Sequence, residues 1–382
     1  MNTALPKQLA NRLLSLDVFR GLTIALMVLV NTPGSWSHVY APFLHAKWHG
    51  CTLTDLVFPN FVFIVGVSMA FSLSKYTASN SQLLKGPAFR KILKRTILIF
   101  LVGLALNWFP FYHINIADLR FYGVLQRIAL AYGLAASLCV LLPPKHWLSA
   151  AIGLALAYWG ILVLGADAGA AFTLEGNLKR AIDLATVGEN HMYGGFGIPF
   201  DPEGLIGLIS TAATALLGAY AGHVIKSQPT KLDAVKRLLL LGVLLIVAGQ
   251  LSNLWIPINK PLWTSSYVMY AGGIAAMVLG VLLYMIDVKA WKGWTNPFIH
   301  FGTNPLIVYV FSGVIVRIMY HLVKWTTDAG ESTNLYSFLW DSVYSAWISP
   351  LKLASLLFAL SIVFTCWLFA YSLYRKRIFI KL

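Results

Sequence analysis

A dense group of polar side chains lies between Asn31 and Asp55, and it contains the residue types best suited to catalysis. His45 and His49 are four residues apart, and Asp55 follows close behind. A histidine titrates near neutral pH, so it can take a proton from an amine or hydroxyl nucleophile, or accept an acyl group itself. Histidines at a membrane interface with no catalytic role are the alternative. The same residues suggest zinc, but without a second ligand cluster we expect no metal.

Asp17 and Arg20 lie three residues apart near the start of the first apolar stretch. On a helix this spacing puts both side chains on one face, where they can pair. Ionisable groups inside a membrane span are costly and are therefore candidates for function. The pair is either a structural anchor for the helix end, or Arg20 faces an internal cavity and meets an anionic ligand.

Gln126 and Arg127 interrupt another apolar stretch. Arg127 must face a partner or a cavity there, because an unpaired charge is expensive in hydrocarbon. Asp17 or Asp55 can neutralise it, and a bound phosphate is the alternative.

Two acidic residues, Asp201 and Glu203, lie in the sequence D-P-E-G shortly after His191. A proline just inside a helix and acids at its N-terminus help to start the helix, so one interpretation is structural. In the other interpretation the two carboxylates line a substrate site on the outer side of the membrane.

The elements that must position these residues are membrane spans. The chain has 382 residues, of which 58% are hydrophobic and 11% charged, whereas soluble domains are about 25% charged. Roughly 20 apolar residues cross the hydrocarbon core as a helix. We therefore expect an all-α polytopic membrane protein with about ten transmembrane helices. The predicted spans are 13–31, 54–75, 91–108, 121–142, 147–165, 204–223, 235–252, 263–286, 298–321 and 350–374.

The net charge of +15 is better explained by membrane topology than by nucleic-acid binding. With the N-terminus in the cytoplasm, 19 of the 29 lysines and arginines fall in cytoplasmic segments and six in outer loops. This bias predicts that both termini are cytoplasmic. The outer loops are then 32–53, 166–203 and 322–349. The polar start of the chain predicts no cleavable signal peptide, and we expect one transmembrane domain over 1–382.

Several motifs together resemble the heparan-alpha-glucosaminide N-acetyltransferase family of transmembrane acyltransferases. The most specific is H-A-K-W-H-G-C-T-L-T-D-L-V-F-P at 45–59. The others are S-L-D-V-F-R-G-L at 15–22, V-N at 30–31, L-Q-R-I at 125–128, D-P-E-G-L at 201–205, I-P-I-N-K-P-L-W-T-S-S-Y at 256–267 and F-G-T-N-P-L at 301–306. The chain looks like the bare bacterial core of that family, without the luminal domain of the lysosomal enzymes.

The resemblance implies transfer of an acetyl group from cytosolic acetyl-CoA to the amine of a glucosamine-type sugar on the periplasmic side. It implies His45 as base or acetyl acceptor, with Asn31 beside it; Asp55 either orients His45 or balances Arg127. Residues expected on the acetyl-CoA side are Asp17, Arg20, Gln126, Arg127 and Asn304. Residues expected on the acceptor side are His191, Asp201, Glu203, Asn259, Lys260 and Trp263.

Both the route of the acetyl group and the function itself have a competing interpretation. The acetyl group passes either directly to the amine or first to His45. An amino-sugar transporter is the competing function, since polar groups inside a membrane domain suit transport as well.

The expected location is the bacterial inner membrane, and the expected partners are acetyl-CoA, the sugar, the lipid bilayer and a possible second copy in a homodimer. We expect no nucleic-acid partner.

Overall fold

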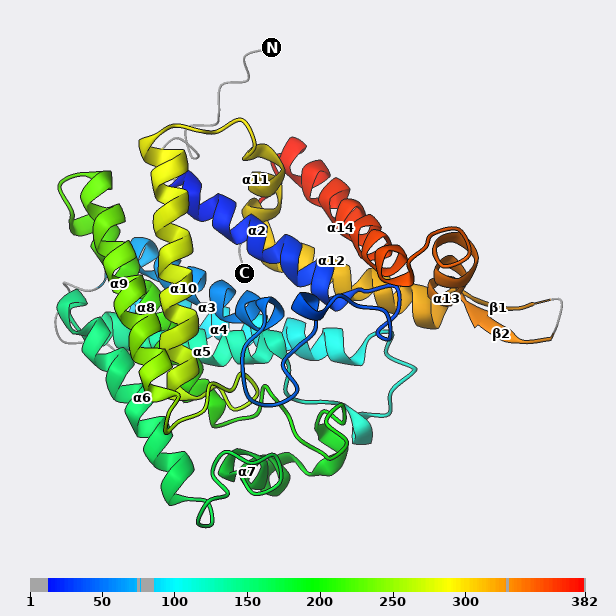
Figure 1. The fold of residues 1–382 in the computed structure, drawn as a ribbon, viewed down its shortest axis with the longest axis horizontal. Coiled ribbons are helices and arrows are strands. Elements are labelled where there is room, and N and C mark those ends of the chain that lie inside the picture. The colour runs from blue at the N-terminus through cyan, green and yellow to red at the C-terminus, as the bar shows by residue number, and fades with distance from the viewer. Residues whose placement is uncertain (1–12, 74–75, 77–85, 328–329, 381–382) are drawn as a thin grey trace.

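The computed structural model describes residues 13–73, 76, 86–327 and 330–380, and these fold into a mostly helical body (Figure 1). This confirms the helical fold class. The α-helices are α2 (Leu14–Asn31), α3 (Leu53–Ser72), α4 (Pro87–Trp108), α5 (Val124–Leu141), α6 (Trp147–Leu164), α7 (Leu178–Val187), α8 (Gly207–Ser227), α9 (Lys231–Ser252), α10 (Ser265–Leu282), α11 (Asn296–Thr303), α12 (Pro305–Arg317), α13 (Leu335–Phe338) and α14 (Leu351–Arg375).

Shorter elements connect these helices. Four are single 3₁₀ turns: η1 (Ala41–Phe43), η2 (Ile116–Asp118), η3 (Pro144–His146) and η4 (Glu189–His191). Three are π-helical: η5 (Leu283–Val288), η6 (Ile318–Leu322) and η7 (Leu339–Tyr344). Strands β1 (Lys324–Thr326) and β2 (Ser332–Asn334) form a small antiparallel hairpin, with Trp325 opposite Thr333.

Eight helical segments of the described chain are long and apolar enough to cross a membrane. They correspond to eight of the ten predicted spans. The other two predictions are α4 and α9, which are helices of 22 residues each. The chain is thus a multi-pass membrane protein, while the total of ten spans stays a prediction. Five of the cations used for the predicted topology, Lys7, Arg12, Lys75, Lys85 and Lys381, lie outside the described residues.

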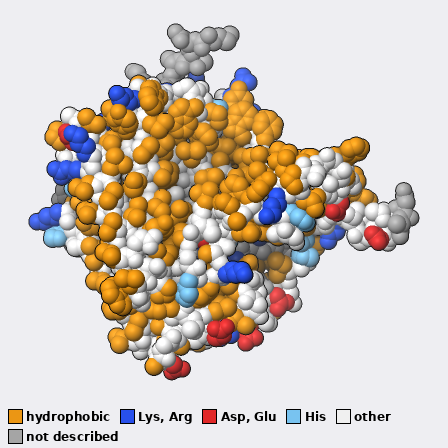
Figure 2. Space-filling view, viewed as in Figure 1, with side chains coloured by type: hydrophobic (Ala, Val, Ile, Leu, Met, Phe, Trp, Pro, Cys, Tyr) orange, Lys and Arg blue, Asp and Glu red, His pale blue; other side chains and the backbone are white. Residues whose placement is uncertain are grey.

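The connections between helices fall into two groups at opposite ends of the molecule. The loops after α2 and α6 lie in the lower part of Figure 1, near α7. The turns between α8 and α9 and between α10 and α11 lie at the upper left. On the space-filling surface, hydrophobic side chains dominate the broad face and charged side chains lie mainly along its margins (Figure 2). This is the pattern of a body embedded in lipid, with polar ends in water.

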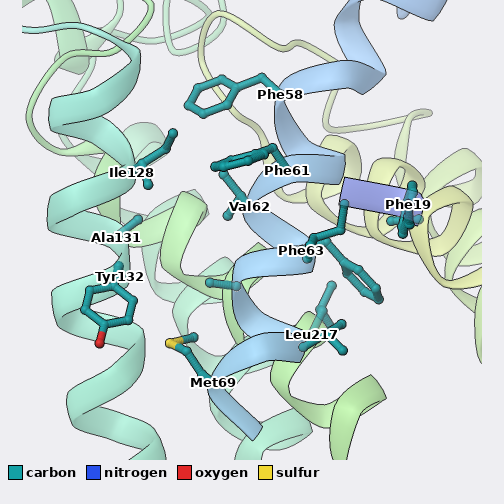
Figure 3. Packing of buried hydrophobic residues seen from close by; sticks show 14 of the residues in the cluster. Phe19, Phe58, Phe61, Val62, Phe63, Met69, Ile128, Ala131, Tyr132 and Leu217 are labelled. Atoms are coloured by element: carbon teal, nitrogen blue, oxygen red, sulfur yellow. The ribbon is translucent and has the colours of Figure 1, made fainter. Parts of the chain in front are cut away.

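Helix α3 lies in the centre of the packing. Its side chains meet α5 on one side and α8 on the other, with Phe61, Phe63 and Met69 fully buried (Figure 3). A methyl group at Gly66 would overlap the backbone oxygen of Ala215 on α8. Small residues permit such close helix approach in membranes, where packing replaces the hydrophobic driving force.

One predicted span is divided. The stretch 298–321 was expected as a single helix, but α11 ends and α12 begins at Asn304. The reason is Pro305, which disfavours the helical conformation of the residue before it. The side chain of Asn304 then bonds the backbone of the C-terminal segment, donating to the oxygen of Ile378 at 2.9 Å and accepting from the nitrogen of Ile380 at 2.9 Å.

Candidate active site

The first turn of α3 carries the central carboxylate. Thr52 is the N-cap and Asp55 is the third residue of the helix, and together they form a reciprocal capping box. Asp55 Oδ2 accepts from the backbone nitrogens of Ala46 and Thr52, each at 3.0 Å. It also shares the hydroxyl proton of Thr52, at 3.0 Å, with the backbone oxygen of Leu44, which lies nearer at 2.7 Å. These three donors hold an ionised carboxylate at a position that is 1% exposed, close to the positive end of the helix dipole.

The other carboxylate oxygen meets the candidate catalytic histidine. His45 Nδ1 lies 2.6 Å from Asp55 Oδ1. Since the carboxylate can only accept, the proton of this hydrogen bond is on Nδ1. The second ring nitrogen, Nε2, then carries a free lone pair. The side chain of His45 is 46% exposed, so that lone pair is accessible to a substrate.

The loop between His45 and Asp55 is fixed at a second point. Gly50 pairs with Asn259 in an isolated parallel bridge, and Asn259 Nδ2 donates to the backbone oxygen of Trp48 at 3.0 Å. Tyr267 on α10 donates its hydroxyl to the backbone oxygen of Asp55 at 2.5 Å. Asn259 is fully buried and acts here as a positioning residue for the loop.

Asn31 is the last residue of α2, and its side chain is exposed. In the part of the chain that the structure describes, its amide has no hydrogen-bond partner. It therefore presents a donor and an acceptor at the end of α2, directly before the loop that carries His45.

Cys51 lies beside this pair, but its chemistry is suppressed. Burial raises the pKa of its thiol to about 12; the charge of Asp55 adds to this rise, and Lys260 opposes it. The reactive form of cysteine is the thiolate, which is scarce at neutral pH when the pKa is this high. Of the Cys51 thiol and the His45 imidazole, the imidazole is thus the one available for acyl chemistry.

The two acids predicted to face a substrate, Asp201 and Glu203, both pair with Arg120. Arg120 donates to both oxygens of Asp201 at 2.8 Å and to Glu203 at 2.7 Å. Burial alone raises the pKa of Glu203, but Arg120, followed by Lys260, brings it below its ordinary value. Asp201 is fully buried, and its pairing with Arg120 holds the segment before α8 in place.

Arg127 binds backbone carbonyl oxygens and not the carboxylates of Asp17 or Asp55 that were expected as its partners. Its guanidinium donates to the backbone oxygens of Gly204 at 2.9 Å and Pro202 at 3.0 Å, and it is 1% exposed. Asp55 is engaged with His45, and Asp17 with Arg20. The turn before α8 places carbonyl oxygens against the start of α5, an arrangement that a sequence without coordinates does not reveal.

A buried amine completes this support. Lys179 on α7 donates to the backbone oxygens of Pro202 at 2.6 Å and Pro261 at 2.7 Å. Burial lowers the pKa of Lys179 to about 7 and raises the pKa of nearby Asp183 to about 6. Lys179 thus joins α7 to the turn before α8 and to the segment that carries Asn259.

The remaining residues predicted on the acceptor side have separate surroundings. His191 stacks on Phe121 at 4.3 Å and its Nδ1 lies 2.6 Å from the oxygen of Leu119. Trp263 is 1% exposed and its indole donates to Thr214 at 3.0 Å within the core. Lys260 is half-buried, near enough to Cys51 and Glu203 to affect the pKa of each.

The residues predicted on the acetyl-CoA side do not form one group. Arg20 pairs with Asp17 at 2.9 Å, and also donates to the hydroxyl of Ser68 at 2.7 Å and the oxygen of Gly302 at 3.2 Å. Asn304 follows Gly302 closely on the chain, so these residues share the α2–α11 contact. Gln126 lies beside Arg127 at the start of α5, where both are buried.

An open cleft lies next to the His45 loop. Its volume is about 550 Å³. One wall comes from Lys47, Trp48 and His49, directly after His45, and the other from residues of the segment before α7 and the segment before α8. Those other lining residues are Thr173, Leu174, Glu175, Gly195 and Phe196. Sequence reasoning missed Trp48, Glu175 and Phe196, because only the folded chain brings these loops together.

Metal ligation has little support in the described part of the chain. No group of three or more His, Cys, Asp or Glu side chains is placed there to hold a metal ion. His45 and His49, the two histidines that suggested zinc, have different partners: Asp55 for His45 and the Asn259 amide, at 3.3 Å, for His49.

Comparison with known proteins connects this geometry to a family. A model of the heparan-alpha-glucosaminide N-acetyltransferase catalytic region matches residues 12–183, which include His45, Asp55 and one side of the cleft. The mouse heparan-alpha-glucosaminide N-acetyltransferase is 30% identical over 98% of this chain. This chain is similar to the heparan-alpha-glucosaminide N-acetyltransferases over nearly its whole length. The human heparan-alpha-glucosaminide N-acetyltransferase is also 30% identical, over 97% of this chain.

The relationship covers nearly all of this chain but not all of its relatives. The chain spans 61% of the length of the mouse protein and 60% of the human one. The names of these heparan-alpha-glucosaminide N-acetyltransferases state an acetyl transfer to an amine of a glucosaminide. The His45–Asp55 pair lies within the segment matched by the catalytic model of the family.

Proposed function

We propose that this protein is a transmembrane acetyltransferase that moves an acetyl group from cytosolic acetyl-CoA to the amine of a glucosamine-type sugar on the periplasmic side of a bacterial inner membrane. The observation that carries the proposal is the contact of 2.6 Å between His45 Nδ1 and the buried carboxylate of Asp55. In the neutral imidazole this contact leaves the lone pair on Nε2, as a general base requires.

The reaction follows from this arrangement in the direct mechanism. The sugar amine attacks the thioester carbonyl, forming the C–N bond, while Nε2 of His45 takes the amine proton. The C–S bond breaks, and the proton on His45 passes to the CoA thiolate. Asp55 stabilises the imidazolium that exists between these steps, and the Asn31 amide is the proposed donor to the carbonyl oxygen as negative charge develops.

The two-step mechanism uses the same atoms. Nε2 attacks the thioester carbonyl first, the C–S bond breaks, and CoA leaves as the thiolate, which takes a proton from water. The amine then attacks the carbonyl of acetyl-His45, the bond to Nε2 breaks, and the amine proton passes to solvent. Quenching the enzyme after mixing with acetyl-CoA alone distinguishes the two. A labelled acetyl group that stays on wild-type protein and is absent from His45→Ala supports the two-step route.

The donor requires cations for its phosphates. Arg20 and Arg127 are engaged with protein oxygens, whereas Arg90, Lys91 and Lys94 in the first turns of α4 are exposed. These three residues are therefore our preferred contacts for the phosphates of acetyl-CoA. Replacing Lys91 and Lys94 with glutamine is expected to raise the KM for acetyl-CoA with little change in kcat.

A sided assay tests the proposed function against transport. The protein is reconstituted in vesicles with radiolabelled acetyl-CoA trapped inside and glucosamine outside. Transfer predicts labelled N-acetylglucosamine outside, in amounts that depend on His45. Uptake of N-acetylglucosamine without acetyl-CoA, equal in wild type and His45→Ala, would instead identify a transporter.

The helix break at Asn304 is a feature that transporters also have. Here the side chain of Asn304 is bonded to the C-terminal segment.

A further inference from the structure

The cleft beside His45 has the size and lining of a sugar site. Its volume of about 550 Å³ lies within the range of small-molecule sites. Two aromatic side chains, Trp48 and Phe196, lie on it together with the carboxylate of Glu175, the ammonium of Lys47 and the hydroxyl of Thr173.

Trp48 is held rigidly. Its indole nitrogen donates to the backbone oxygen of Phe172 at 2.8 Å, and its ring makes edge contacts with Phe196 at 5.8 Å and Phe200 at 5.3 Å. Its backbone oxygen accepts from the buried Asn259. A platform fixed in this way loses little entropy when a ligand stacks on it.

The charges of the cleft select the kind of ligand. Glu175 and Lys47 have opposite signs, so a phosphate or a nucleotide would be repelled by one carboxylate while meeting a single ammonium. A pyranose ring suits both groups, because its hydroxyls donate to a carboxylate and accept from an ammonium. Its C–H face packs on an aromatic ring.

We propose that this cleft is the acceptor subsite, with Trp48 and Phe196 as the stacking surfaces for an amino-sugar ring and Glu175 as the acceptor of its hydroxyl hydrogen bonds. The proposal rests on the proposed function for the identity of the amine. Lys47, Trp48 and His49 belong to the loop that carries His45, so a ring in this cleft lies against that loop. His49, on the same wall, is fixed by Asn259 and has its pKa lowered by burial.

The test measures binding of D-glucosamine to the full-length protein in detergent, without acetyl-CoA, by isothermal titration. Trp48→Ala and Glu175→Gln are each expected to weaken binding about tenfold. Glu175 is exposed, so its replacement does not threaten folding. Phe196→Leu gives a second test of the aromatic wall that leaves the His45 loop untouched. Glu189→Gln, an exposed acid outside the cleft, is the matched control and is expected to bind like wild type.

The outcomes separate this proposal from the proposed function. Weaker binding in the three cleft variants supports the subsite even if wild type transfers no acetyl group. The subsite is overturned if wild type acetylates glucosamine while the cleft variants keep the wild-type KM for it. It is also overturned if wild type does not bind glucosamine at millimolar concentrations. Unchanged acetyl-CoA binding in Glu175→Gln shows that any loss belongs to the acceptor.

Discussion

At the scale of single residues, Asp55 has two functions that are carried by different oxygens. Oδ2 caps α3 through three donors, and Oδ1 holds the Nδ1 proton of His45. The helix end therefore fixes the position of the carboxylate, and the carboxylate fixes the tautomer of the histidine. Helix capping and base orientation depend on the same side chain.

Asp55→Asn is expected to reduce acetyl transfer by about 10²- to 10⁴-fold. The three donors at Oδ2 demand the amide oxygen there, so the amide nitrogen must face His45 Nδ1. That nitrogen donates, which moves the histidine proton to Nε2 and removes the base. Initial rates with saturating acetyl-CoA measure the effect.

Thr52→Ala is the control for the cap. It removes the Thr52 hydroxyl, at a cost of about 1 kcal/mol in stability, and leaves the His45–Asp55 contact in place. Its activity per folded molecule is expected to stay near wild type. An Asp55→Asn enzyme as active as Thr52→Ala would contradict the orienting role of Asp55.

Much of this site could be predicted from the sequence, but only its local part. His45 and Asp55 are ten residues apart, and the capping pattern of Thr52 and Asp55 is visible in the sequence. The partners of Arg127 could not be predicted, because they are backbone oxygens that lie more than 70 residues away. Glu175 was missed for a similar reason, since its relation to Trp48 exists only after folding.

At the scale of elements, α7 is attached to the rest of the molecule by a buried charge. Lys179 bonds two backbone oxygens, from the segments before α8 and before α10, and Asp183 accepts from the backbone of Leu205 at 2.8 Å. Arg127, Asp201 and Glu203 also act on the charge of Lys179. The support of the His45 loop through Asn259 therefore depends on the docking of α7.

This attachment predicts a dependence of stability on pH. The pKa of Lys179 is about 7 in the folded protein and 10.5 ordinarily, so the unfolded chain binds more protons between these values and stability rises from pH 7 toward 10. Asp183 has the opposite sign: its pKa rises from 3.8 to about 6, so stability falls as the pH increases from 4 to 6. Melting temperatures across this range measure both effects.

Lys179→Met and Asp183→Asn isolate the two contributions. Lys179→Met is expected to flatten the rise of melting temperature between pH 7 and 10. Asp183→Asn is expected to flatten the decrease of melting temperature as the pH increases from 4 to 6. A wild-type profile whose alkaline rise persists unchanged in Lys179→Met would show that other groups cause it.

The contact between α3 and α8 depends on two small residues. A methyl at Gly66 would overlap the oxygen of Ala215, and a methyl at Gly218 would overlap the oxygen of Phe63. Either alanine substitution is expected to destabilise the protein by about 1–3 kcal/mol, because backbone atoms must move apart. Gly160 on α6 has open space around it, so Gly160→Ala should keep or slightly raise the melting temperature. Equal effects of Gly66→Ala and Gly160→Ala would contradict close α3–α8 packing.

At the scale of the whole molecule, the hydrophobic patterning predicted the helices better than their ends. Eight predicted spans correspond to helices of sufficient length and hydropathy. Two features were not predicted: the division at Asn304 and the π-helical ends η5 and η6. Apolar periodicity does not show where a helix is interrupted when the polar groups freed by the interruption bond to backbone atoms far away in the sequence. The start of α8 at Gly207 instead of 204 has the same origin, in a turn held by Arg127.

The predicted topology has a direct test. In a Cys51→Ser background, cysteines placed at Glu175 and at Lys145 are exposed on opposite sides of the membrane if the charge bias is correct. A membrane-impermeant maleimide added to intact cells is expected to label Glu175→Cys at once and Lys145→Cys only after permeabilisation. The reverse pattern would invert the topology and place the His45 loop in the cytoplasm.

The central claim is that His45, held by Asp55, performs acetyl transfer. The most direct measurement is the formation of N-acetylglucosamine and free CoA thiol by purified protein given acetyl-CoA and glucosamine, with wild type beside His45→Ala. We predict stoichiometric products from wild type and a rate at least about 100-fold lower from His45→Ala, with acetyl-CoA binding preserved. Equal rates in the two proteins, or no turnover by wild type with any amino sugar, would contradict the account.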